Sequence, residues 1–365
     1  MTTCKKCGKS SEETAKVLSL CAECIREADS ECLTKLKGIH AASREKFDLP
    51  ALPPSAPEGT QCRLCQNNCQ IAIGGRGYCG VRRNENGHLM GGTPKEAVVS
   101  WYYDPLPTNC VADWVCAGGT GAGYSKWAYQ PGAEQGYLNL AVFYGACTFN
   151  CLFCQNWHYR EHSTTNRTHT AVELAEAVTA QTLCICFFGG DPTCQLPHAL
   201  TASRLAREKN PQRILRICWE TNGSMNPKLL DKMMSLSLES GGCVKFDLKA
   251  MEPNIHYALC GVDNKRTLEN FARAAQRIAE RPELPPLVAS TLLVPGYIEA
   301  QEIGAIASFI ANINPDIPYA LLGFHGDFLM TDLPRTSWDQ ANRCLEAARG
   351  AGLKRVRIGN THILR

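Results

Sequence analysis

Cysteine is the feature that most constrains this chain, because 21 of its 365 residues are cysteine. Eleven of them fall into three spaced groups, at positions 4/7/21/24, 62/65/69/79 and 147/151/154. The first residues, MTTCKKCGKS, have no apolar run typical of an export signal, so we expect a cytoplasmic protein with reduced thiols. Reduced thiols at short spacings are typical metal ligands. The pattern therefore predicts metal centres rather than disulfides.

Charge argues against nucleic acid as a partner, and the lengths of the apolar runs argue against a membrane span. The 38 basic and 35 acidic residues leave a formal net charge of +3, which gives no electrostatic footprint of a nucleic-acid binder. No run of about 18 apolar residues occurs, so no membrane span is expected.

Composition divides the chain into four parts. Residues 1–46 hold two Cys-x2-Cys pairs and a predicted helix over 31–47, and we interpret them as a zinc-ribbon-like module. Residues 47–60 are proline-rich and predict an extended linker. Residues 61–136 form a second Cys-rich, irregular lead-in segment, and residues 137–365 form the main domain.

In the main domain, short apolar runs alternate with amphipathic stretches, which is the pattern of β–α units on a parallel sheet. Six or seven such units predict an α/β fold, a partial (β/α)6-type TIM barrel with small N-terminal metal-binding modules. The predicted strands are 138–144, 183–188, 213–219, 243–248, 288–293, 319–324 and 354–358. The predicted helices are 171–182, 197–209, 227–237, 267–280, 300–313 and 337–350.

Distinctive residues follow these strands directly. Cysteines follow the first, a Gly-Gly-Asp the second and Glu-Thr-Asn-Gly the third. Because the carboxyl ends of parallel barrel strands share one face, we expect these side chains to meet in one active site.

Three thiols lie within eight residues in the segment Cys147-x3-Cys151-x2-Cys154. Three thiolates can cap three irons of a [4Fe–4S] cubane and leave the fourth iron open to a ligand such as S-adenosylmethionine (SAM). A structural zinc site and unrelated core cysteines are the alternative interpretations. Zinc usually takes four ligands, which favours iron.

The segment with Phe153 before its last cysteine resembles the signature of the radical SAM superfamily. FFGGDP resembles its GGE-type motif, and ETNG resembles the DTNG segment of pyruvate formate-lyase activating enzymes. The segment QCRLCQNNCQI, with GYCGVR after it, resembles the N-terminal part of AmmeMemoRadiSam-type radical SAM proteins. By these motifs the chain resembles the radical SAM superfamily, and within it the pyruvate formate-lyase activating enzymes and the AmmeMemoRadiSam-type proteins.

The resemblance implies a role for each matching residue. Cys147, Cys151 and Cys154 would hold the [4Fe–4S] cluster and act in catalysis. Two departures from the family pattern, GGD for GGE and ETNG for DTNG, change the reach of a carboxylate by one methylene. The implied cofactor-binding residues are Phe153, Gly189, Gly190, Asp191, Glu220, Asn222, Lys249, Pro295, Gly296 and His325.

The other two groups predict further metals. Cys4, Cys7, Cys21 and Cys24 have zinc-ribbon spacing, with free surface thiols as the alternative. The four thiols Cys62, Cys65, Cys69 and Cys79 predict a knuckle that binds either an iron–sulfur cluster or zinc.

Several cysteines lie outside these groups. Cys110 and Cys116 could be extra ligands or a thiol that acts on the substrate, while four others in strand runs are interpreted as small core residues. Those four are Cys184, Cys186, Cys218 and Cys243.

The sequence therefore predicts an anaerobic radical SAM enzyme, which takes an electron from flavodoxin or ferredoxin. It would cleave SAM reductively to a 5′-deoxyadenosyl radical and abstract hydrogen from a substrate. The substrate could be a partner protein, as in glycyl-radical activation, or a small molecule, peptide or RNA. A non-catalytic metal-ribbon binding protein is the alternative from another class.

Overall fold

An eight-stranded sheet forms the centre of the computed structural model, which describes residues 1–108, 110–164 and 167–365. The strand order is β16-β15-β14-β13-β12-β11-β9-β8. Seven of these strands run parallel, and β8 pairs antiparallel with β9 at one edge. The partial α/β barrel predicted from the sequence is confirmed, with seven parallel strands. The strands are β8 (Val99–Pro105), β9 (Leu138–Tyr144), β11 (Thr182–Phe188), β12 (Arg216–Thr221), β13 (Val244–Asp247), β14 (Leu287–Leu293), β15 (Tyr319–Gly323) and β16 (Val356–Gly359).

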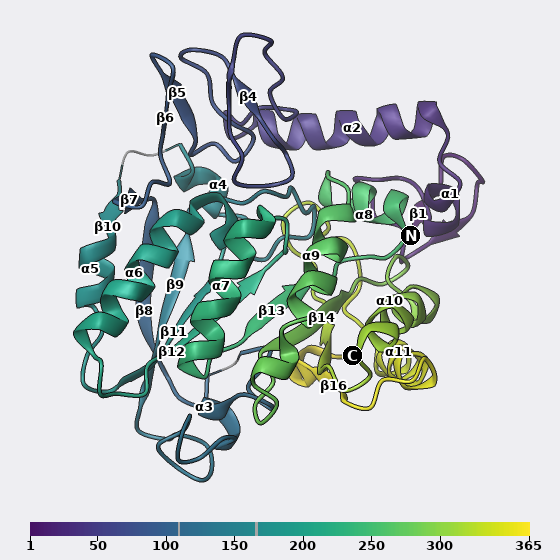
Figure 1. Ribbon diagram of the computed structural model, residues 1–365. Helices are drawn as coiled ribbons and strands as arrows, with labels where there is room; N and C mark the ends of the chain where they lie inside the picture. The colour runs from purple at the N-terminus through teal and green to yellow at the C-terminus, as the bar shows by residue number, and fades with distance from the viewer. Residues whose placement is uncertain (109, 165–166) are drawn as a thin grey trace.

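Helices cover the outside of this sheet (Figure 1). α5, α6, α7 and α9 lie side by side over one part of it, and α10 and α11 cover the part next to β14–β16. The helices of the barrel are α4 (Tyr159–His162), α5 (Ala171–Glu176), α6 (Leu196–Lys209), α7 (Pro227–Ser240), α8 (Pro253–Cys260), α9 (Lys265–Ala275), α10 (Ala300–Ile313) and α11 (Trp338–Gly350), with short 3-10 turns at η1 (Pro192–Gln195), η2 (Ile278–Glu280) and η3 (Thr361–Ile363).

Local sequence explains these boundaries. β11 is apolar after Thr182 and is buried on both faces, as expected for a central parallel strand. α7 begins after Asn226, whose side chain accepts a hydrogen bond from the amide of Lys228, with Pro227 in the first turn. It ends at Gly241, where φ is +79° and a side chain would be strained.

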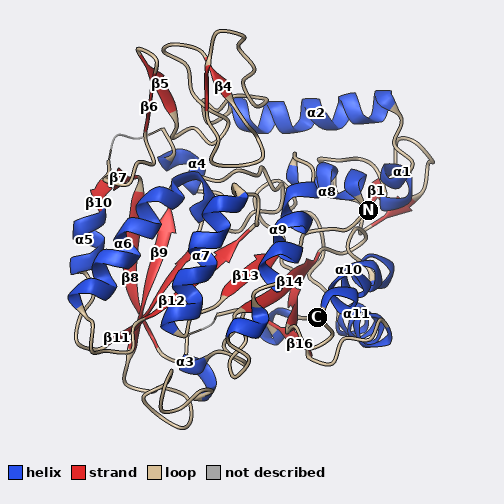
Figure 2. Ribbon diagram, in the orientation of Figure 1, coloured by secondary structure: helices blue, strands red, loops and turns tan. Residues whose placement is uncertain are grey.

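The Cys-rich N-terminal parts lie at the end of the barrel toward which the parallel strands point, whereas α3 (Ala117–Thr120) lies at the opposite end (Figures 1 and 2). The long helix α2 crosses above α8 in this view. The N-terminal elements are β1 (Thr2–Thr3), β2 (Ser10–Ser11), α1 (Ala22–Arg26), α2 (Ser30–Glu45), β3 (Thr60–Gln61), β4 (Gln70–Ile71), β5 (Arg83–Glu85) and β6 (His88–Met90), and the small pair β7 (Glu96–Ala97) with β10 (His169–Thr170) follows.

Two sequence-based boundaries differ from the structure. β8 lies within the lead-in segment 61–136, yet it pairs along its whole length with β9 and so belongs to the barrel sheet. The proline-rich segment 47–60 contains turns and packs against the second Cys-rich segment. Leu49 is buried, and the carbonyl of Pro54 accepts a hydrogen bond from the amide of Gln70. Within the described chain, no helix is both long and apolar enough to cross a bilayer.

Candidate active site

The loop after β9 carries the three thiols Cys147, Cys151 and Cys154, each of them half-buried. They line a cavity of about 460 Å³ at the carboxyl ends of the strands. The structure therefore places these cysteines beside the loops that follow β11, β12 and β13. The predicted site residues that line this cavity are Cys147, Cys151, Phe153, Cys154, Gly189, Gly190, Asp191, Glu220, Asn222 and Lys249.

Backbone hydrogen bonds hold the cysteine loop against the end of α8. The amides of Asn150 and Leu152 donate to the carbonyls of Cys260 and Leu259 at 2.8 and 2.9 Å. The buried guanidinium of Arg160 donates to the side chain of Asn150 and to the carbonyl of Cys151. This places a positive charge beside thiols that carry negative charge when a metal binds them. The sequence did not single out Arg160, because its role depends on the fold of the loop.

Two glycines let the loop after β11 approach the cysteine loop closely. Gly190 has φ +54°, and a Cβ atom there would lie 2.2 Å from the carbonyl oxygen of Tyr144. At Gly189 a Cβ would lie 1.7 Å from the ring of Phe143. Only glycine fits these positions, so the Gly-Gly pair is a requirement of the backbone.

Asp191 joins two loops of the site. Its carboxylate accepts hydrogen bonds from the amides of Thr193 and Asn222 at 2.8 and 2.7 Å, and from the hydroxyl of Thr221 at 3.1 Å. Burial raises the pKa of this carboxyl above its ordinary value, although these hydrogen bonds oppose the rise. Asp191 therefore orders the loops after β11 and β12 in addition to lining the cavity.

The second Cys-rich segment reaches the cysteine loop directly. The side chain of Asn67 donates to the carbonyl of Thr148 at 2.9 Å. The hydroxyl of Thr148 in turn accepts from the amide group of Asn222 at 2.7 Å, and that same group points at Cys147 Sγ, 3.7 Å away. The backbone amide of Gln66 also donates to the carbonyl of Ser224 at 2.9 Å. The segment is thus part of the site's framework.

Lys249 supplies a cation to the lining of the cavity. Its ammonium donates to the Asp247 carboxylate at 2.8 Å, which also accepts from the hydroxyl of Ser290. Burial lowers the pKa of Lys249, but the charges of Asp247 and Cys151 outweigh burial and raise it above its ordinary value. The lysine therefore stays charged at neutral pH.

Three predicted cofactor-binding residues, Pro295, Gly296 and His325, do not line this cavity. The loop after β14 turns toward the N-terminal module, where a Cβ on Gly296 would lie 2.3 Å from the carbonyl oxygen of Glu13. His325 is half-buried in the segment after β15. The structure thus separates these three from the ten residues that it brings together.

The thiol groups differ in spacing, and spacing separates a single metal ion from a cluster. The Sγ atoms of the N-terminal group all lie within 4.8 Å of one another, with Cys7 and Cys21 3.8 Å apart. A zinc–sulfur distance of about 2.3 Å in a tetrahedron gives nearly this separation. Neither the 147/151/154 nor the 62/65/69/79 group gathers so tightly in the described chain. In a cubane each thiolate caps a different iron, so its thiols need not gather around one ion.

A small pocket is lined by all four thiols of the second group, and Cys194 joins them there. A hydrogen bond from Cys194 lowers the pKa of Cys79 to about 6. This fifth thiol comes from η1, directly after the Gly-Gly-Asp loop, so no local spacing could have assigned it.

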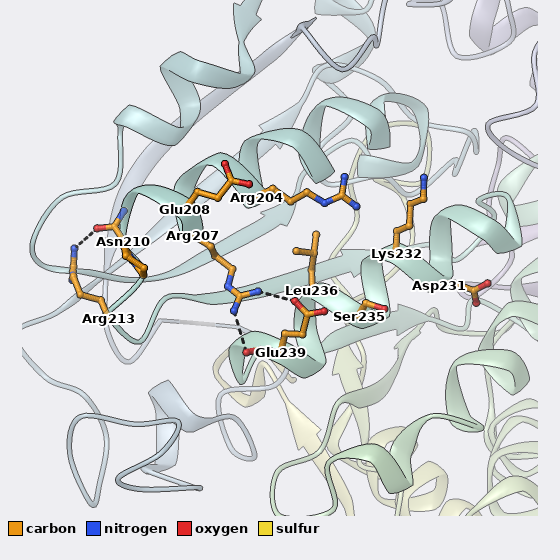
Figure 3. Close-up of a pocket in the computed structure, with 11 residues that line it drawn as sticks. Arg204, Arg207, Glu208, Asn210, Arg213, Asp231, Lys232, Ser235, Leu236 and Glu239 are labelled. Carbon is orange, nitrogen blue, oxygen red and sulfur yellow. Dashed lines mark hydrogen bonds and ion pairs between the residues drawn. The ribbon is translucent and has the colours of Figure 1, made fainter.

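A larger hollow, of about 640 Å³, lies outside the barrel between α6 and α7 (Figure 3). Its walls carry both positive and negative side chains, and some of these pair with each other, as Arg207 does with Glu239 at 3.0 Å. It holds none of the predicted site residues. We therefore place the chemistry in the barrel cavity.

Comparisons with known proteins agree with this placement. A model of the Radical SAM superfamily matches residues 141–310. The chain is 25% identical over 307 residues to protein MJ0808 of Methanocaldococcus jannaschii, covering 82% of this chain and 81% of that protein. It is 34% identical over 138 residues to isethionate sulfite-lyase activating enzyme of Desulfovibrio desulfuricans, covering 38% of this chain and 40% of that one. It is 25% identical over 199 residues to pyruvate formate-lyase 1-activating enzyme of Escherichia coli K12, covering 52% and 76%.

Proposed function

Residues 141–310 of this chain belong to the radical SAM superfamily, and from this premise we propose that the barrel cavity binds a [4Fe–4S] cluster and SAM. Cys147, Cys151 and Cys154 would hold the cluster. The observation that carries the proposal is that these thiols share one cavity with the Gly-Gly-Asp and Glu-Thr-Asn loops. Bound there, the cluster and SAM would supply a 5′-deoxyadenosyl radical able to abstract a hydrogen atom from a substrate.

The side chains that line the cavity would bind SAM and orient it. Gly189 and Gly190 leave room for the methionyl end of SAM beside the cysteine loop, and Asp191 fixes both loops. Glu220 and Asn222 offer hydrogen-bond partners to the ribose and methionyl parts. Lys249 carries a charge that suits a carboxylate, either of SAM or of the substrate. For Pro295, Gly296 and His325 the family resemblance is the only support.

For the substrate we favour a partner protein in which a glycyl radical is formed. Support comes from relatives that are activating enzymes for isethionate sulfite-lyase and pyruvate formate-lyase. The chain covers only 40% of the first of these proteins. The test is EPR of candidate partner proteins after incubation with the reconstituted enzyme, SAM and a low-potential flavodoxin or ferredoxin. A doublet from a glycyl radical is the expected result.

A small molecule or peptide is the second candidate substrate. It is favoured by the absence of a further Cys-x2-Cys group after Cys154, where activating enzymes with ferredoxin-like inserts carry theirs. Activity on small substrates without any protein radical would select it.

We propose zinc for the N-terminal cysteine group, on the spacing of its thiols, and an iron–sulfur cluster for the 62/65/69/79 group. The second centre would lie next to the cysteine loop, to which Asn67 and Gln66 are bonded. A position there suits electron transfer toward the active site.

Reductive SAM cleavage tests the whole proposal. Reconstituted protein with dithionite and SAM should release 5′-deoxyadenosine and methionine, and Cys151→Ala should release neither. If a protein with a full iron complement produces no 5′-deoxyadenosine, the chain is a non-catalytic metal-binding protein and the proposal fails.

A further inference from the structure

A buried ammonium lies beneath the cavity, between two thiols and a carboxylate. Lys245 on β13 is 1% exposed and donates to Cys110 Sγ at 2.8 Å, to Glu220 Oε1 at 2.8 Å and to Cys186 Sγ at 3.3 Å. These three acceptor atoms all lie within 4.8 Å of one another. They could hold a metal ion by spacing alone, but the ammonium already bonds to all three. We therefore interpret the group as a thiol pair held by a lysine.

The sheet register brings these side chains to one place. Glu220 on β12 pairs with Lys245 on β13, and Cys186 on β11 pairs with Cys218 on β12. Neighbouring residues in register point to the same side of a parallel sheet. Cys110 reaches them from the segment that follows β8. In the sequence Cys186 has the pattern of a small core residue, because only the sheet register reveals its partners.

The two thiols differ in access. Cys110 lines the barrel cavity together with Cys147, Cys151 and Glu220, and is half-buried. Cys186 is 4% exposed and lies behind it. A group in the cavity can therefore meet Cys110, which in turn lies beside Cys186.

Cys110 and Cys186 can share one proton between their sulfur atoms. The hydrogen bond from Cys186 lowers the pKa of Cys110, with help from the charge of Lys245, and the same hydrogen bond raises the pKa of Cys186. Because the ammonium contacts both sulfur atoms, either one can carry the negative charge. The two sulfur atoms lie within 4.8 Å of each other, and a neighbouring thiol and thiolate are the reduced form of a disulfide.

We propose that Cys110 and Cys186 form a redox-active dithiol that donates a hydrogen atom to a carbon radical in the cavity and ends as a disulfide. The proposal rests on the proposed function, which supplies the radical. The proton of Cys186 first passes to the Cys110 thiolate, which leaves Cys186 as the thiolate. Cys110–SH then gives its hydrogen atom to the carbon, since an S–H bond is weaker than the C–H bond formed. The thiyl radical then bonds to the Cys186 thiolate, and the resulting disulfide radical anion returns one electron to the low-potential carrier.

Electrons and hydrogen atoms balance over these steps. One thiol and one thiolate lose two electrons in total. One of those electrons stays with the transferred hydrogen atom, and the other replaces the electron that started SAM cleavage. The overall change is SAM plus dithiol to methionine, 5′-deoxyadenosine and disulfide when no other substrate is present. An external thiol would restore the reduced pair.

Solvent deuterium tests the hydrogen transfer without a known substrate. Thiol hydrogens exchange with D2O, whereas carbon-bound hydrogens do not. Reconstituted enzyme with SAM and dithionite in D2O should therefore release 5′-deoxyadenosine that carries one deuterium at C5′. Cys110→Ser should lower the deuterated fraction at least fivefold, because a serine hydroxyl does not give up a hydrogen atom to a carbon radical.

Cys116→Ser is the matched control. Cys116 lies in the same segment and caps α3 through Gly119, a hydrogen bond that serine can keep, but it does not line the cavity. It should give the wild-type deuterium content. Undeuterated product from the wild type, or equal deuterium content in Cys110→Ser, overturns the dithiol proposal. Failure to release any 5′-deoxyadenosine would instead count against SAM cleavage itself.

Disulfide mapping gives a second readout. It uses wild-type protein, so it does not depend on a bound cluster or on the folding of a variant. Cluster-free wild-type protein is treated with oxidised glutathione, alkylated with N-ethylmaleimide and digested for mass spectrometry. A Cys110–Cys186 disulfide is expected, and it should also accumulate in loaded enzyme as SAM is consumed. If these two cysteines stay fully alkylated under both conditions, the dithiol assignment is wrong.

Discussion

The imidazole of His40 accepts a hydrogen bond from the side chain of Asn150, with 3.0 Å between Nδ1 and Nδ2. The same ring contacts the carbonyl of Ala258 through Nε2 at 3.1 Å. His40 belongs to α2 of the N-terminal module, Asn150 lies between two predicted cluster ligands, and Ala258 lies in α8. One buried histidine thus joins three parts of the chain at the edge of the active site.

This contact requires a neutral ring, so acid should weaken it. Burial lowers the pKa of His40 to about 4, from an ordinary value near 6.5. Below pH 6.5 the unfolded chain binds a proton that the folded chain does not, so stability falls as pH decreases toward 4. The loss is at most about 3 kcal/mol for this residue. Urea unfolding at pH 7.5 and pH 5.0 should show a smaller difference for His40→Gln than for wild type.

The control for that measurement is His88→Gln, on the exposed side of β6. It should keep the wild-type pH dependence. Equal pH dependence in His40→Gln and wild type would contradict the role given to His40.

Gly190 should not tolerate a side chain. Gly190→Ala places a Cβ 2.2 Å from a backbone oxygen at a positive φ, and the left-handed conformation alone costs about 1–2 kcal/mol. We expect a lower melting temperature and at least tenfold weaker SAM binding by calorimetry. Gly132→Ala is the matched control, because nothing lies within 4 Å of its Cβ position. Wild-type SAM affinity in Gly190→Ala would show that the cofactor does not use this loop.

The floor of the barrel depends on a buried ion pair. The carboxylate of Glu134 accepts from Arg216 at 3.0 Å, and both side chains are fully buried. Glu134→Ala leaves the guanidinium without its counter-charge, which should cost about 3–5 kcal/mol of unfolding free energy. Glu239→Ala removes an exposed partner of Arg207 and should cost under about 1 kcal/mol. Similar losses in both variants by denaturant titration would contradict this ranking.

Metal analysis separates the three thiol groups. Anaerobically reconstituted protein should hold about one zinc and about eight iron per chain, by plasma mass spectrometry. Cys24→Ser should lose zinc and keep its iron, whereas Cys65→Ser should lose about half of the iron. Zinc loss in Cys65→Ser would show that the second group is a zinc site.

The sequence was most informative where residue pattern and function coincide. Strand 138–144 and helix 300–313 were predicted to the residue, because apolar periodicity is strong there. The cysteine loop and the glycines after β11 carry a dense local motif, and the structure brings them together. α8 was not predicted, since its eight residues are bounded by Pro253 and Gly261 with little amphipathic pattern.

Long-range partners could not be predicted from one sequence. Lys245 lies in an apolar strand run, and nothing nearby in the sequence indicates that Cys110, 135 positions earlier, accepts its hydrogen bond. Cys194 joins the second cysteine group in the same way, across more than one hundred positions. Such contacts follow from sheet order and loop closure, which are properties of the whole fold.

The pairing of β8 with β9 has a practical consequence for anyone who expresses parts of this protein. A clone limited to the recognisable superfamily segment would begin at residue 141, inside β9. It would lack the edge strand and the Asn67 bond that steadies the cysteine loop, and it would expose a bare strand edge to aggregation. An expressed fragment that keeps β8 and the Asn67 contact must therefore begin ahead of residue 67, well before the segment that matches the superfamily model.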